Sequence, residues 1–262
     1  MNQTYMKEKK IFPLVMSMAL PMMLSMAFNS LYNIVDSYFV AKLSEDAMTA
    51  LSLVYPAQNL LTAVAVGFGV GVNAMISFYL GAQNQEKADK TATQGMVLGV
   101  LHGVLFMILF LCGMNWFLGM FTKSDTVRAL GMEYSNVVFL FSTIVTGGIT
   151  LEKIFQAVGR MRATMVSMIA GFVTNIVLDP LLIFGIGPFP RMEIAGAALA
   201  TGIGQVITLL VYIIYYVLDP LPVKLRRTYL RPEGEICGKT YGIGIPATLN
   251  MALPSLLISA LN

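Results

Sequence analysis

Long apolar segments alternate with short polar segments along the whole of this chain. Each apolar segment is long enough to cross the hydrocarbon core of a bilayer as a helix, which takes about 20 residues. The pattern predicts seven membrane-spanning helices, at residues 12–41, 51–80, 92–118, 130–151, 163–186, 194–218 and 240–262. The sequence therefore predicts an all-α polytopic membrane protein. Its first span should remain as a helix, because it is too long for a signal peptide.

Composition and charge agree with this class. The 262 residues are 56% hydrophobic and 12% charged, about half the charged share of a typical soluble domain. Most of the 17 lysine and arginine residues precede the first span or follow the second, fourth and sixth spans. By the positive-inside rule, the N-terminus and the connection 219–239 are predicted to be cytoplasmic.

Two carboxylates, Asp36 and Asp179, lie deep within apolar segments. A carboxylate inside a bilayer costs roughly 2.5–3.5 kcal/mol even on lenient insertion scales, so it is expected to face a protein interior or a water-filled path. Counted along each helix at about 1.5 Å per residue, both acids fall in the outer half of the membrane. The two carboxylates can therefore share one site that binds a proton or a cation.

Three predicted spans each carry a stripe of polar and small residues at intervals of three or four, which places each stripe on one helical face. The stripes are Ser25, Asn29, Asn33 and Asp36; Ser167, Gly171, Asn175 and Asp179; and Thr201, Gln205, Thr208 and Tyr212. Hydrogen bonds between helices, at about 0.6–2 kcal/mol per contact, would explain the neutral groups alone. The two acids favour a hydrated pocket, with Asn29, Asn33 and Gln205 as polar lining of a substrate path.

Two prolines lie within these spans, Pro21 in the first and Pro180 directly after Asp179. Proline removes its own N–H and crowds the carbonyl four residues earlier. A bend at Pro180 would free the carbonyl of Ile176 beside Asn175, and hard oxygen ligands around a carboxylate suit Na⁺. We expect a hinge at each proline, with a static kink as the alternative, since prolines are common in membrane helices.

Glycines predict packing rather than chemistry. Gly95, Gly99 and Gly103 are spaced four apart, which lets helices approach closely. Gly67, Gly69 and Gly71 are expected to loosen the second span.

Catalytic and metal chemistry find little support in the residue types. His102 is the one histidine and is expected to pack between helices, and the two cysteines, Cys112 and Cys237, make no disulfide framework. A structural metal site needs more ligands, and an intramembrane enzyme needs a nucleophile with its base. The chain is therefore predicted to be neither an enzyme nor a cofactor protein.

The connection 219–239, rich in proline and charge, marks a boundary between helical units. Beyond it the pattern Pro-x-x-Leu-x-Met-Ala-x-x-Ser-Leu of residues 21–31 returns at residues 246–256, and many transporters are built from internal repeats. We expect a six-helix lobe at 1–218, a cytoplasmic inter-lobe loop at 219–239 and the start of a second lobe at 240–262. The whole protein should be about twice this length, and a half-size protein that pairs with itself is the alternative.

Together these motifs resemble the MATE family (multidrug and toxic compound extrusion), most closely its bacterial MepA-like branch. The matching stretches follow the family order: Ala19–Pro21, Asn33–Val40, Ile76–Ser77, Leu80–Ala82, Phe155–Arg160, Asn175–Pro180, Gly196–Thr201 and Ile243–Pro246. Ala41 is a mild departure, because the family pattern usually has glycine there. The family has about twelve helices in two lobes, so the resemblance covers the first lobe (the N-lobe) and the start of helix seven.

The resemblance implies a multi-pass transporter of a bacterial plasma membrane that expels cationic amphipathic drugs in exchange for H⁺ or Na⁺, by alternating access of two lobes. It also implies that Asp36, Asn175, Asp179 and Thr201 form the cation-coupling site, which would hold Na⁺ if coupling is to sodium. The expected partners are small cationic drugs or dyes, the bilayer and the second lobe, and no nucleic acid.

Two further functions compete with drug efflux. A related flippase for a lipid-linked precursor would share the lobes and the repeat, but it predicts a strongly basic cavity, and the predicted spans contain no buried lysine or arginine. A passive ion channel would not require a duplicated lobe. These residues do not distinguish H⁺ from Na⁺ as the coupling ion.

Overall fold

The structure, a computed structural model, describes the backbone of residues 10–261 and the side chains of residues 10–253. Its helices are α2 (Ile11–Ala41), α3 (Glu45–Gly81), α4 (Gln85–Phe121), α5 (Asp125–Leu140), α6 (Ser142–Ala157), α7 (Met161–Phe184), α8 (Glu193–Leu218), the 3₁₀ helix η1 (Arg227–Tyr229) and α9 (Gly234–Leu261). The described residues contain no strand, so the predicted all-α class is confirmed. Residues 1–9, which carry part of the charge behind the predicted orientation, lie outside the described residues.

The predicted membrane spans correspond to the helices of the structure. Five helices, α2, α3, α4, α7 and α8, are long and apolar enough to cross a membrane, and α5 with α6 makes a bent span with an angle of 47°. α9 coincides with the predicted seventh span, 240–262, and begins six residues before it.

Three of the helices begin at a capping side chain. Ser44 accepts a hydrogen bond from the Ala47 N–H, Asn84 from the Lys87 N–H, and Ser124 from the Val127 N–H. Each cap satisfies a backbone donor that the first helical turn leaves free. The connections between α2, α3, α4 and α5 are only a few residues long, so consecutive helices run antiparallel.

The fourth span is longer than predicted, because it continues past the break at Phe141 to the end of α6. Glu152 and Lys153 therefore lie inside a helix and not in a connection. Their side chains are only 14% and 12% exposed, and the Lys153 ammonium lies 3.0 Å from the Glu152 carboxylate. A mostly buried lysine does occur in this span, contrary to the prediction, but its charge is paired.

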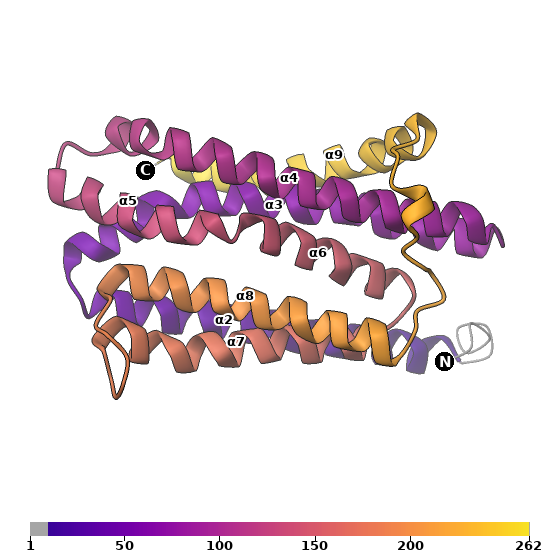
Figure 1. The fold of residues 1–262 in the computed structure, drawn as a ribbon, viewed down its shortest axis with the longest axis horizontal. Helices are drawn as coiled ribbons and strands as arrows, with labels where there is room; N and C mark the ends of the chain where they lie inside the picture. The colour runs from indigo at the N-terminus through magenta and orange to yellow at the C-terminus, as the bar shows by residue number, and fades with distance from the viewer. Residues whose placement is uncertain (1–9, 262) are drawn as a thin grey trace.

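The helices form a bundle in which α5 and α6 lie between two groups (Figure 1). α2, α7 and α8 pack together on one side, and α3, α4 and α9 pack together on the other. The N-terminal end of α2, the start of α4 and the start of α9 all lie at the same end of the bundle (Figure 1).

Glycines set the closest helix contacts. A Cβ added at Gly99 or Gly103 would meet the Thr150 or Thr146 side chain of α6, so the predicted close packing of α4 is confirmed. The expectation for the second span was wrong, because α3 is one continuous helix through its glycines. A Cβ at Gly71 would collide with the Thr240 carbonyl oxygen of α9, so this glycine admits a neighbouring helix.

Both prolines lie inside continuous helices. α2 runs through Pro21, and α7 runs through Pro180 with Asp179 in helical conformation. The Ser25 hydroxyl donates to the Pro21 carbonyl at 2.9 Å. Packing of α7 against α2 and α8 outweighs the local bias that proline places on the preceding residue. The hinges stay predictions.

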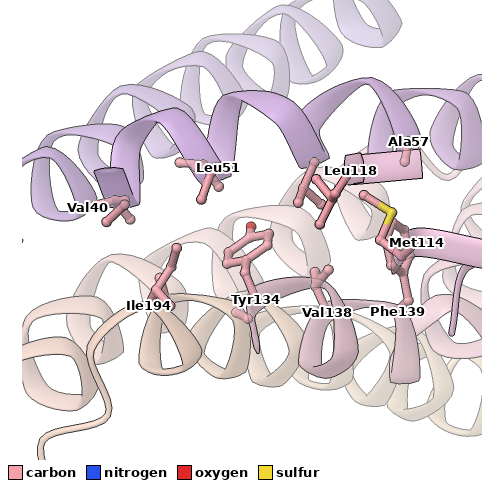
Figure 2. Close-up of a cluster of buried hydrophobic side chains, with 14 of the residues drawn as sticks. Val40, Leu51, Ala57, Met114, Leu118, Tyr134, Val138, Phe139 and Ile194 are labelled. Atoms are coloured by element: carbon pink, nitrogen blue, oxygen red, sulfur yellow. The ribbon is translucent and has the colours of Figure 1, made fainter. Parts of the chain in front are cut away.

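A cluster of buried side chains joins several helices at the end of the bundle opposite the N-terminus. Figure 2 shows Val40 of α2, Leu51 and Ala57 of α3, Met114 and Leu118 of α4, Tyr134, Val138 and Phe139 of α5, and Ile194 of α8. In a bilayer these contacts stabilise the bundle by close van der Waals packing, because lipid tails are as apolar as the side chains. The cluster fixes the position of Tyr134, whose hydroxyl group receives a hydrogen bond from the Gln58 amide at 3.4 Å.

Candidate functional site

Asn175 joins two of the polar stripes. Its side-chain amide donates to Asp179 Oδ1 at 3.3 Å within α7, and to Thr201 Oγ1 of α8, also at 3.3 Å. All three residues are buried, with Asp179 at 0% exposure and Asn175 at 2%. The structure thus brings three of the four predicted coupling residues into hydrogen-bonding contact.

Small residues explain why α7 and α8 approach so closely here. A Cβ at Gly171 would lie 2.6 Å from the Gly204 carbonyl oxygen, and a Cβ at Gly204 would lie 2.8 Å from the Gly171 carbonyl oxygen. Gly171 is one helical turn before Asn175, and Gly204 is three residues after Thr201. The glycine contact therefore sets the distance at which the amide of Asn175 can reach the hydroxyl of Thr201.

Asp36 enters the same region from α2. It is 7% exposed, and it lies close enough to Asp179 for the two carboxylates to interact electrostatically. One turn earlier on α2, the Tyr32 ring stacks on Phe172 of α7 with centroids 5.4 Å apart and planes 8° from parallel. This stacking holds α2 against α7 and places both acids on facing helices.

Three side-chain oxygen atoms of this region lack hydrogen-bond donors. Asp36 Oδ1, Asn175 Oδ1 and Asp179 Oδ2 are buried, and none accepts a hydrogen bond from the described part of the chain. No lysine, arginine or histidine of that part forms an ion pair with either acid. Buried acceptors without donors are costly, by about 1–3 kcal/mol each and more for a charge. The arrangement suits a species that supplies positive charge, such as a proton or a small cation.

Two tyrosines near the acids were not predicted from the sequence. Tyr32 lies beside Thr201 and within electrostatic reach of Asp36 and Asp179. Tyr134 of α5 is fully buried and is also close enough to Asp36 for the two groups to interact electrostatically. Tyr32 could have been found, because it is four residues before Asp36 on the same helical face. Tyr134 gave no such signal, since only the packing of α5 against α3 turns its hydroxyl inward.

The predicted polar lining divides into buried and exposed parts. Asn29 and Asn33 lie on an exposed face of α2, where the Asn33 amide donates to Asn29 Oδ1 at 2.7 Å. Gln205 is half-buried, and Ser167 is buried with its hydroxyl unpartnered among the described residues. Asn29 and Asn33 are thus hydrogen-bonded to each other on an exposed face, and their role as lining stays a prediction.

The remaining candidate groups have structural surroundings. His102 Nε2 and the Tyr241 hydroxyl are 2.9 Å apart, and the His102 ring meets the Phe68 ring edge-on, so the expected packing role is confirmed. Cys112 and Cys237 are free thiols. In the described residues, no three His, Cys, Asp or Glu side chains gather as a metal site would require. A cation near Asp36 and Asp179 would therefore use neutral oxygens as well as the acids.

Known proteins similar to this chain are transporters. Multidrug export protein MepA of Staphylococcus aureus is 30% identical over 246 residues, which cover 94% of this chain and 54% of MepA. MepA of Staphylococcus saprophyticus is 28% identical over 246 residues, which again cover 94% of this chain and 54% of the relative. The chain spans about half the length of the curated relatives it matches.

Solved structures give the same picture. A MATE structure in complex with MaD3S matches with a TM-score of 0.86 and 29% identity, covering 95% of this chain and 55% of that one. An outward-facing multidrug resistance MATE transporter of the MOP superfamily matches with a TM-score of 0.84 and 28% identity. The match covers 91% of this chain and 52% of that one. The family model MatE matches residues 21–181. This chain therefore belongs to the MatE family, and it is a multi-pass membrane protein related to multidrug transporters and not to enzymes.

Proposed function

We propose that this chain forms the first lobe of a two-lobe multidrug efflux transporter, together with the first helix of the second lobe. The first lobe is residues 1–218, the inter-lobe loop is 219–239, and α9 begins the second lobe. The repeat of the Pro21 pattern at Pro246 supports this division, as does coverage of about half of each relative. The second lobe would be the partner of the exposed face of α2, which carries Asn29 and Asn33.

Transport is driven by cation-coupled antiport, with Asp36, Asn175, Asp179 and Thr201 as the coupling residues. The observation that carries this proposal is the group of buried, donor-free oxygens on Asp36, Asn175 and Asp179. A proton would neutralise one acid and remove its repulsion with the other, because two carboxylates near each other disfavour double ionisation. Na⁺ would take the carboxylate, amide and hydroxyl oxygens, which are hard ligands. Either ion, entering from outside, would then compete with a cationic drug for the same negative charge.

Alternating access would expose this region first to one side of the membrane and then to the other. Transporters of this class move one helical bundle against the other around a site near the membrane midplane. Pro21 and Pro180 are the hinges that we assign to this movement within the first lobe. The N-terminus lies in the cytoplasm, as the positive-inside rule requires, so the drug is collected from the cytoplasm or the inner leaflet.

The test is dye efflux from a bacterium that lacks its own efflux pumps and expresses the complete transporter gene. Preloaded cells are given an inward H⁺ gradient or an inward Na⁺ gradient, each without the other. We expect one of the two gradients to drive loss of a cationic dye. Collapse of that gradient by an ionophore should stop the loss. Absence of efflux under both gradients, with the protein present in the membrane, would refute the proposal.

A control with residues 1–262 alone tests the two-lobe division. This half is expected to insert without transporting dye, since no second bundle is present to move against it. Full efflux from residues 1–262 would show instead that the half pairs with itself.

A further inference from the structure

The connection between α8 and α9 is attached to the start of α4 along its length. Its main anchor is Asp89 of α4, whose side chain is 3% exposed. Asp89 Oδ1 accepts from the Lys224 backbone N–H at 2.9 Å and from the Gln85 amide at 2.8 Å. Asp89 Oδ2 accepts from Arg226 Nε at 3.2 Å. A buried carboxylate that accepts several hydrogen bonds is a strong anchor, because charge-assisted bonds are about twice as strong as neutral ones.

Two more residues of α4 extend this attachment. The Thr93 hydroxyl accepts from the Arg226 backbone N–H at 3.1 Å. The Gln94 side chain is matched on both sides, since it donates to the Arg231 carbonyl at 3.0 Å and accepts from the Glu233 N–H at 3.1 Å. Main-chain groups from residue 224 to residue 233 are therefore bound by side chains of one helix.

The underside of the connection is apolar and buried. Leu221 and Val223 are 4% and 1% exposed, in a cluster that includes Tyr79 of α3 and Ala88 and Ala92 of α4. The Leu225 N–H donates to the Tyr216 hydroxyl of α8 at 2.9 Å. Leu221 and Val223 are buried while the charged Lys224 and Arg226 are exposed, so one face of the segment packs onto the helices. A freely moving linker would not bury its side chains in this way.

The attachment continues into the first turns of α9. Ion pairs join Lys90 to Glu233 at 2.8 Å and Lys87 to Glu235 at 2.9 Å. The Tyr241 hydroxyl then meets His102 of α4, and the Thr240 carbonyl lies against Gly71 of α3.

We propose that residues 221–233, here named the strap, are a fixed part of the first lobe, and that movement between the lobes is absorbed within α9 instead. Asp89 is the positioning residue of the strap. The inference rests on the proposed two-lobe transport function. α9 packs against α3 as far as Thr248, whose backbone would collide with a Cβ on Gly67. The joint therefore lies beyond that contact, where Pro254 lacks the N–H that would bond to the Asn250 carbonyl.

The first experiment locks the strap in the complete transporter. Cys112 and Cys237 are replaced by serine, Lys90→Cys and Glu233→Cys are introduced, and a short bifunctional thiol reagent joins them. The partly exposed ion pair that this removes, with side chains 20% and 46% exposed, contributes about 1 kcal/mol or less. We expect crosslinked and uncrosslinked protein to export dye at rates within about twofold of each other. Loss of efflux on crosslinking, with recovery on cleavage of the crosslink, would overturn the proposal.

The second experiment releases the strap. In the unmodified transporter we expect slow amide hydrogen exchange at residues 224–233. Asp89→Ala should speed that exchange and reduce efflux several-fold at equal membrane abundance. The control is Glu133→Ala, at an exposed acid of α5 that lies outside the contacts of the strap, and it should change neither. When Asp89→Ala is combined with Lys90→Cys and Glu233→Cys, crosslinking the two cysteines should restore efflux. Fast exchange in the unmodified strap, or no recovery on crosslinking, would contradict a fixed strap. If the unmodified transporter exports no dye, the proposed function is wrong. The fixed position of the strap is then still tested by hydrogen exchange.

Discussion

The side-chain amide of Asn175 donates a hydrogen bond to the carboxylate of Asp179 at 3.3 Å, one helical turn away on α7. The same amide reaches Thr201 on α8, so Asn175 orients the acid and joins the two helices. Its carbonyl oxygen remains without a donor in the described structure. Asn175 therefore keeps a buried, unsatisfied acceptor one turn from Asp179.

Replacing Asn175 by alanine removes both hydrogen bonds and the free oxygen. Since a hydrogen bond to a charged group is worth about 1.5–3 kcal/mol, we expect efflux to fall by roughly tenfold or more. The matched control is Thr174→Ala, because the Thr174 hydroxyl only bonds to the Ala170 carbonyl of its own helix. Initial rates of dye loss at equal protein abundance provide the measurement. Equal rates for the two variants would show that Asn175 has no part in coupling.

Neutralising either acid should abolish coupled transport. Asp36→Asn and Asp179→Asn keep the shape of each side chain, but an amide neither exchanges a proton nor offers full charge to Na⁺. The variants should fold, because neither acid has a basic partner in the described structure that would lose its charge pair. Reconstituted in vesicles, they should show no dye-driven flux of H⁺ or Na⁺. Asp46→Asn, at an exposed acid of α3, serves as the control, and wild-type flux in both site variants would disprove the assignment.

Close packing of α3 on α9 should be sensitive to a single methyl group. Gly71→Ala places its Cβ against the Thr240 carbonyl, a backbone atom that cannot turn aside. Overpacking of this kind costs about 1–3 kcal/mol, so the melting temperature of the complete transporter should fall by several degrees. Gly148→Ala in α6 has no atom within 4 Å of the new Cβ, and it should keep or raise the melting temperature. Equal melting temperatures for the two variants would contradict the contact.

The start of α9 should respond to acid at an unusually low pH. Hydrogen bonds from Lys239 and then Lys87 lower the pKa of Glu235 to about 2, from the usual 4.5. A carboxyl whose pKa is lowered by folding stabilises the folded state above its unfolded pKa, and this contribution disappears as the pH falls toward the folded pKa. The difference in melting temperature between wild type and Glu235→Gln should therefore be constant from pH 8 to about 5. It should then shrink between about pH 4.5 and 2, and a difference that stays the same over this range would show that Glu235 is unpaired.

The sequence was a good guide to what the bilayer imposes on each helix separately. Hydropathy locates spans because an apolar solvent acts on every residue of a segment, whatever its neighbours are. Polar spacing likewise placed Asn175 and Asp179 on one face of α7. The predicted helix boundaries were less accurate. α3 and α4 are each 37 residues long, which is longer than the predicted spans, and their N-terminal caps at Ser44 and Asn84 were not predicted. The role of the four predicted coupling residues stays a prediction.

Only the tertiary structure shows which helices are in contact and which side chains each contact buries or brings together. Tyr134 reaches the region of Asp36 only because α5 packs across α3, and Lys153 is buried only because α6 continues beyond the break at Phe141. Gly71 looks like a flexible point until α9 is seen against it. The polar connection after α8 looks like a mobile linker until Asp89 is found beneath it. Periodicity along one helix specifies its faces, whereas the partner of each face depends on contacts between separate segments, 26 residues apart for Asn175 and Thr201 and 135 for Asp89 and Lys224, which local pattern does not encode.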